Sequence, residues 1–185
     1  MKREQRERLD AEFSAFVATR GRQLVRLAEL LTGDPHRAAD IVQSALERAY
    51  PHWHRISGDD PMAYVRRIVV NQHRDWWRRR RNHELAADLS ADDRADPTDL
   101  GERHAQRSLV LGALTRLTVR ERTVVVLRYY ADLSEAQIAA ELGIAVGTVK
   151  STLHRALAKL RALPEFLGRT PRQPAATAAR NEVTL

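Results

Sequence analysis

Apolar residues recur every three or four positions along most of this chain, which is the spacing of an amphipathic α-helix. One such stretch runs from Phe13 to Leu31, a second from Pro35 to about Ala49, and a third from about 61 to 81. Four shorter stretches fill about 105–163. No segment alternates convincingly with the period of two that a half-buried strand would show. The pattern therefore predicts an all-α protein.

Residues that start and stop helices divide this pattern into two parts. Gly33 ends the first helical stretch, and Asp34-Pro35 has the residue order of a helix start. Residues 83–104 lose the helical period and gain acidic residues, and the last residues are rich in Pro, Ala and Thr. The sequence thus predicts two small helical domains joined by a flexible acidic linker and followed by a disordered tail. Their expected bounds are 10–82, 83–104, 105–163 and 164–185.

The charges are unevenly distributed. The chain of 185 residues has a formal net charge of +7, which favours an anionic partner. Residues 66–81 hold seven arginines and one acid, residues 82–103 hold seven acids, and residues 143–163 hold four basic residues and no acid. Two basic blocks that flank an acidic spacer are not the even charge of a merely solubilised surface.

Several classes of protein are disfavoured by what the sequence lacks. There are no cysteines, so disulfides, thiolate metal sites and cysteine nucleophiles are excluded. The seven histidines show no metal-binding spacing beside acids, and no catalytic constellation is present. We therefore expect no metal, no cofactor and no enzymatic activity. The apolar runs are too short to span a membrane, and the charged N-terminus is not a secretory signal, so we expect a cytoplasmic protein without membrane insertion.

Residues 133–161 have the spacing of a helix-turn-helix. Ser134 and Gln137 form a capping box that starts one helix, and Gly143 can adopt the left-handed geometry that ends it. Ala139 and Val149 stand where two crossing helices need a small residue and a plug. The outer face of the second helix carries side chains that donate hydrogen bonds to phosphates and base edges, namely Lys150, Ser151, His154 and Arg155. The alternative is a plain helical hairpin with a solvated basic face.

With "LTVRERTVVVLRYYADLS" before it, "SEAQIAAELGIAVGTVKSTLHRALAKLR" resembles region four of the bacterial sigma factors, and most of all the extracytoplasmic-function (ECF) group. The resemblance implies binding to the minus-thirty-five promoter element and to the polymerase flap. It implies groove contacts by Lys150, Ser151, His154 and Arg155, and a DNA backbone contact by Arg128.

The N-terminal half resembles region two of the same family. "DPHRAADIVQSALERAYPHW" is similar to the helix that binds the coiled coil of the polymerase clamp, with a polar ridge of Asp40, Gln43, Ser44 and Glu47. "YVRRIVVNQHRDWWRRRR" is similar to the helix that binds the minus-ten element. The resemblance implies minus-ten contacts by Arg67, Asn71, Arg74, Asp75, Arg78 and Arg81.

The tryptophan pair in this last stretch invites a different interpretation. Housekeeping sigma factors open the promoter with two adjacent tryptophans, but aligned on the helix that pair would fall near 67 and 68, so Trp76-Trp77 is not equivalent to it. The helical period predicts that Trp76 lies in the core beside Met62, Val65, Val69 and Gln72, with Trp77 at the edge of the basic face. In ECF members a flipped base is read by the preceding loop, which here is Pro51 to Asp60.

The resemblance thus predicts a sigma factor that binds RNA polymerase core and promoter DNA and directs transcription initiation. An anti-sigma factor is a further candidate partner. The alternative is a helix-turn-helix regulator that does not bind core polymerase, and a third interpretation is a basic protein that binds RNA or a membrane surface by charge alone.

Overall fold

The computed structural model describes residues 3–84 and 102–164, and no strand occurs among them, so the all-α prediction is confirmed. The helices are α1 (Arg3–Thr32), α2 (Pro35–Ala49), η1 (Tyr50–His52), α3 (Trp53–Ile56), α4 (Pro61–Glu84), α5 (Glu102–Thr115), α6 (Val119–Tyr129), α7 (Glu135–Leu142) and α8 (Val146–Arg161). Both α4 and α5 extend into the predicted linker. The rest of that linker, 85–101, and the predicted tail from 165 onward lie outside the described residues.

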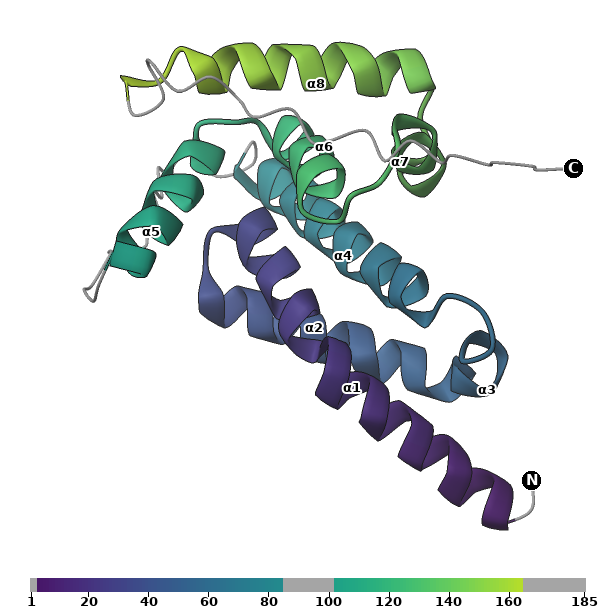
Figure 1. Cartoon of the computed structure of the whole chain (residues 1–185). Coiled ribbons are helices and arrows are strands. Elements are labelled where there is room, and N and C mark those ends of the chain that lie inside the picture. The colour runs from purple at the N-terminus through teal and green to yellow at the C-terminus, as the bar shows by residue number, and fades with distance from the viewer. Residues whose placement is uncertain (1–2, 85–101, 165–185) are drawn as a thin grey trace, which may run out of the picture.

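The corner between α1 and α2 forms as the sequence predicts. Gly33 has a φ of 76°, and its N–H donates to the carbonyl of Glu29 at 2.8 Å, which closes the last turn of α1. The Asp34 carboxylate accepts from the N–H groups of His36 and Arg37 at 2.8 and 3.2 Å, and Pro35 begins α2. These local interactions place α1 and α2 side by side (Figure 1).

The N-terminal helices α1, α2 and α4 enclose one core. Leu24 and Leu31 of α1, Ala45 of α2 and Val69 of α4 are fully buried. Trp53 packs into the same core, with its ring centroid 5.0 Å from that of Phe13 and 4.9 Å from that of Phe16. Trp53 begins α3, which directly follows η1, so the stretch predicted as a loop at 51–60 is in part helical. Truncating a buried aromatic ring of this kind costs about 3–5 kcal/mol.

The buried face of α4 differs from the one that we predict from its period. Val65 and Val69 are buried as expected, but Met62, Gln72 and Trp76 are only half-buried. The other buried positions are Arg66, Val70 and His73. The prediction was wrong because a regular period assumes one buried side, whereas α4 packs against three helices, α1, α2 and α6.

In the C-terminal half, α6, α7 and α8 pack around Leu127, Ile138 and Val149, which are all fully buried. Each of the first two helices starts with a capping box, formed by Thr118 with Glu121 in α6 and by Ser134 with Gln137 in α7. The helix-turn-helix predicted from the sequence is therefore present, with α7 and α8 as its two helices.

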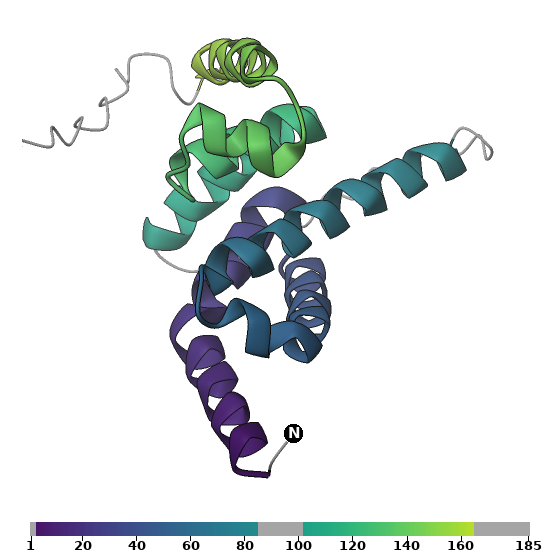
Figure 2. The same ribbon diagram turned by 90° about the vertical axis from the view of Figure 1, so that its right-hand side faces the viewer.

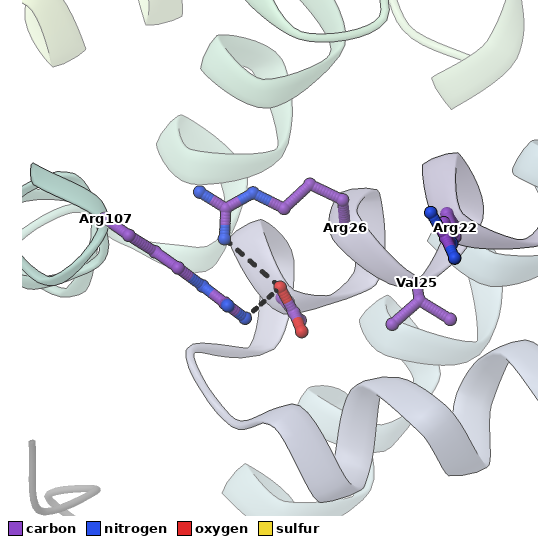
Figure 3. A pocket seen from close by; sticks show the side chains of 5 residues that line it. Arg22, Val25, Arg26 and Arg107 are labelled. Atoms are coloured by element: carbon purple, nitrogen blue, oxygen red, sulfur yellow. Dashed lines mark hydrogen bonds and ion pairs between the residues drawn. The ribbon is translucent and has the colours of Figure 1, made fainter. Parts of the chain in front are cut away.

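The two halves are in contact. Helix α6 packs against both α1 and α4, so the C-terminal helices lie directly on the N-terminal ones, as the second view shows (Figure 2). The Arg122 guanidinium spans this boundary, with Nη1 donating to the Leu31 carbonyl at 3.0 Å and Nε to the Leu114 carbonyl at 2.8 Å. A second link is made by Glu29, whose carboxylate receives Arg26 of its own helix and Arg107 of α5 (Figure 3).

Candidate nucleic-acid interface

The turn between α7 and α8 sets the direction of the second helix of the motif. Gly143 adopts a left-handed conformation with a φ of 65°, and its N–H donates to the Ala139 carbonyl. Ala139 is small and buried, so α7 and α8 can approach closely, and Val149 fills the space between them. The same apolar positions of α8 that pack inward force its polar positions outward.

Four predicted contact residues lie on that outward side of α8. Lys150, Ser151, His154 and Arg155 are all exposed. Their internal contacts are long or local: Lys150 Nζ lies 3.9 Å from a Glu135 carboxylate oxygen, and Arg155 donates to the Thr152 hydroxyl at 3.5 Å. These donors are thus available to a nucleic-acid groove, and the width of a major groove admits a helix.

Arg128, also predicted to contact DNA, is held differently. It is half-buried, its Nη1 donates to the Leu133 carbonyl at 3.2 Å, and it lies 3.7 Å from the Asp132 carboxylate. Asp132 itself has a φ of 52°, an uncommon conformation for a residue other than glycine. Arg128 therefore braces the turn between α6 and α7, and its contact with DNA stays a prediction.

The predicted basic face exists on α4. Arg67, Asn71, Arg74 and Arg78 are exposed and recur at helical spacing along one side. Asp75 is half-buried and pairs with Arg78 at 3.0 Å, and Arg74 donates to the Leu142 carbonyl of α7 at 3.3 Å. Arg81 belongs to α4, but its side chain lies outside the described residues.

Trp76 does not occupy the core position predicted for it, whereas Trp77, beside the exposed Arg78, is half-buried. Trp76 is half-buried beneath the Arg37 guanidinium, which lies 3.7 Å from the ring centroid, and the Trp77 ring meets Trp76 edge-on at 5.0 Å. The Trp77 indole N–H is buried and has no hydrogen-bond partner among the described residues. An arginine that covers an aromatic face in this way gains a cation–π interaction of about 0.5–2 kcal/mol. Trp76 is thus a surface anchor for α2 and not a core residue.

The polar ridge predicted on α2 lies beside this pair. Asp40, Gln43 and Glu47 are exposed, and Gln43 donates to Glu47 at 3.1 Å. Ser44 is half-buried because its hydroxyl accepts from Gln72 of α4 at 3.2 Å. The sequence alone predicts these residues as one ridge of a single helix.

The structure adds neighbours to this ridge. Arg37, Gln72 and Trp76 line one open pocket together with Asp40. The sequence could have predicted Arg37 as part of this surface, because it stands three residues before Asp40 on the same helix. The sequence of α2 could not predict Gln72 and Trp76, because they belong to another helix. The candidate surface therefore combines two helices.

Within the residues that the structure describes, no three His, Cys, Asp or Glu side chains converge closely enough to hold a metal ion. In that same part of the chain, no helix is long and apolar enough to cross a membrane.

Comparison with known families identifies both halves. Residues 13–83 match the model described as sigma-70 region 2, and residues 107–160 match the one described as sigma-70, region 4. These ranges coincide with the two packed halves of the structure.

Curated relatives match most of the chain. It is 43% identical over 152 residues to the RNA polymerase sigma-E factor of Streptomyces coelicolor, which covers 81% of this chain and 84% of that protein. It is 36% identical over 154 residues to the ECF RNA polymerase sigma factor SigL of Mycobacterium tuberculosis, covering 80% of this chain and 85% of that one.

Two solved structures share the fold. One is the sigma factor RpoE in complex with the anti-sigma factor NepR from Bartonella quintana, with a TM-score of 0.59, 22% identity, and coverage of 86% of this chain and 96% of that one. The other is CnrH in complex with the cytosolic domain of CnrY, with a TM-score of 0.55, 29% identity, and coverage of 83% and 87%.

Proposed function

The chain belongs to the sigma-70 family, in its extracytoplasmic-function group, and from this membership we propose which of its surfaces meet RNA polymerase and which meet the promoter. As a member of that group it is a sigma factor, which binds core polymerase and directs promoter recognition and transcription initiation. A helix-turn-helix regulator without polymerase binding would leave the match over 13–83 unexplained.

The proposal rests on one observation, which is that α8 and α4 each expose a basic face and α2 exposes an acidic-polar ridge. The face of α8 (Lys150, Ser151, His154 and Arg155) reads the minus-thirty-five element, and Arg128 supports it at the DNA backbone. The face of α4 contacts the minus-ten element through Arg67, Asn71, Arg74, Asp75, Arg78 and Arg81. Arginine suits both tasks because it pairs with phosphates and with guanine edges.

The ridge of α2 is assigned to the polymerase. Three of its side chains are exposed and do not contribute to the core, namely Asp40, Gln43 and Glu47. Ser44 connects α2 to α4 by a hydrogen bond from Gln72. We extend this surface to Arg37 and Trp76, because a stacked arginine and indole form a preorganised contact with little entropy left to lose on binding. The clamp coiled coil of the polymerase is the partner expected on this side, and the flap is the partner expected for the C-terminal half.

The proposed function gives this chain no catalytic step, since RNA synthesis belongs to the polymerase that the chain binds. It places the chain in the cytoplasm, where that polymerase works. It keeps an anti-sigma factor as a candidate partner, a role supported by the fold shared with RpoE, which was solved with NepR.

The assignment of the α2 ridge is tested by binding to core polymerase. The change is Asp40→Ala together with Gln43→Ala, and we expect core affinity to fall by at least 10-fold while the circular-dichroism helix signal stays unchanged. The physical reason is that both side chains are exposed and make no contact with the apolar core.

A matched control is Glu4→Ala with Gln5→Ala, which removes an acid and an amide from the exposed start of α1. It should bind core polymerase like the wild type in the same fluorescence titration. If both double variants bind with wild-type affinity, the α2 ridge is not the polymerase contact.

A further inference from the structure

A buried ion pair joins the two halves of the chain. Arg66 of α4 donates from Nε to both carboxylate oxygens of Glu141 at 3.2 and 3.1 Å, and from Nη2 to one of them at 3.0 Å. The two side chains are only 11% and 5% exposed. Glu141 lies on α7, so this pair connects the helix with the minus-ten face to the first helix of the helix-turn-helix.

Other hydrogen bonds cross the same boundary. Arg74, one of the proposed minus-ten contacts, donates to the carbonyl of Leu142 directly beside Glu141. Directly after the end of α6, the Tyr130 hydroxyl donates to the Gln23 carbonyl at 3.2 Å. With the Arg122 and Arg107 contacts described above, these bonds hold region two and region four together at several points.

We propose that the Arg66–Glu141 pair is the latch that holds the two halves in this packed arrangement, the closed state, in which the two DNA-binding faces cannot occupy a complete promoter. The inference rests on the proposed function, because it concerns the two DNA-binding faces named there. It names the contact that must break when the halves separate to bind both promoter elements.

The geometry makes the closed state incompatible with the promoter. The two elements are about 25 base pairs apart by their names, which is about 85 Å of duplex at 3.4 Å per base pair. In the structure Arg74 touches Leu142, and only three residues separate Leu142 from α8. Fully stretched, that connection adds about 14 Å, and the 16 residues of α8 add about 24 Å. All of α8 thus lies within about 45 Å of the minus-ten face, roughly half the required span.

The latch acts on the closed state alone. In the closed state both charges are removed from water and satisfied by each other, whereas in the open state water solvates each of them separately. Neutralising one partner leaves the other charge buried and unpaired only while the halves are closed. A single substitution should therefore reduce the ratio of closed to open molecules by about 100-fold or more.

The pair also offers an internal control. Replacing both partners with apolar residues of similar size removes both buried charges, and such replacements are commonly neutral or stabilising. The double variant Arg66→Met with Glu141→Leu should thus stay closed, although Glu141→Gln and Arg66→Gln each open the chain. If the single variants acted only through a change in surface charge, the double variant would not stay closed while each single variant opens.

The test measures the distance between the halves in the full chain. Because the chain has no cysteine, Ser14→Cys on α1 and Ala158→Cys on α8 accept a donor and an acceptor dye at two exposed positions. Single-molecule energy transfer should show a high-transfer population in the wild type and a low-transfer population in Glu141→Gln. Glu135→Gln is the matched control, since it makes the same change on the same helix away from region two, and it should stay closed.

Two results would overturn the latch: a wild type that already shows low transfer, or a Glu141→Gln variant with the wild-type distribution. Adding core polymerase should convert the wild type to low transfer, and binding without this conversion also contradicts the inference. If core polymerase fails to bind at all, it is the proposed function that fails, and the comparison of the free variants still decides about the latch.

Discussion

Acidification should weaken this fold through one buried histidine. His73 of α4 is 1% exposed, and neither ring nitrogen has a hydrogen-bond partner among the described residues. Burial, and to a smaller extent the positive charges of Arg122 and Arg37, lower its pKa to about 3 from 6.5. The folded chain therefore keeps this imidazole neutral at every pH at which the protein works, whereas the unfolded chain protonates it below about pH 6.5.

The sign and size of the effect follow from proton linkage. Below pH 6.5 the unfolded state binds a proton that the folded state refuses, so the contribution of His73 to stability is full above pH 6.5 and declines as the pH falls toward 3. Between pH 7 and pH 5 the loss amounts to about 2 kcal/mol of unfolding free energy. In a domain of ordinary stability that is a large fraction of the total.

Urea titration followed by tryptophan fluorescence measures this loss, because all three tryptophans, Trp53, Trp76 and Trp77, belong to the N-terminal half. His73→Leu should remove about 2 kcal/mol of the difference between pH 7 and pH 5. At pH 7 it should leave stability equal or raise it by about 1 kcal/mol, since two unpartnered polar atoms disappear from the interior. His54→Leu, at an exposed position, should keep the wild-type pH dependence. If the unfolding free energy of His73→Leu falls between pH 7 and pH 5 by as much as that of the wild type, His73 is not the source of the pH dependence.

The remaining predictions concern the two DNA faces and the turn between α7 and α8. Arg155→Ala should reduce the difference in binding free energy between good and poor minus-thirty-five sequences by about 1–3 kcal/mol, because it removes a base contact. A DNA-binding assay measures this difference. Arg78→Ala should instead weaken binding to all promoters alike and reduce the slope of log affinity against log salt by about 0.9, as the loss of one phosphate contact requires; equal behaviour of the two variants would contradict the assignment. Gly143→Ala should lower the free energy of unfolding of the C-terminal half by about 1–2 kcal/mol, because Gly143 has a positive φ. A methyl group at this position would meet no atom within 4 Å, so a steric clash is not the cause. Gly147→Ala, in equally open space but without a positive φ, should be neutral or stabilising, and a similar loss in both variants would show that backbone strain is not the cause.

Short-range signals in the sequence predicted the helices and the chemistry of their outer faces. Asp34-Pro35, the capping box at Ser134 and the glycine at 143 act within four residues of themselves, so their effect does not depend on the rest of the fold. The same is true of Lys150 and Arg155, because the helical period that buries Val149 turns them outward whatever lies beyond.

Which polar residues are buried was decided only by the tertiary structure. Arg66 and Arg67 are adjacent and chemically identical, yet Arg67 is exposed and Arg66 is buried against Glu141, 75 residues away in the sequence. Trp76 likewise meets a partner from another helix, since the Arg37 guanidinium of α2 lies over its ring. A periodic pattern predicts which side of a helix faces an apolar interior. It does not predict which other segment of the chain forms that interior. The long-range pairing of a charge or a ring depends on how the two halves are packed, and the local sequence around Arg66 or Trp76 carries no trace of that packing.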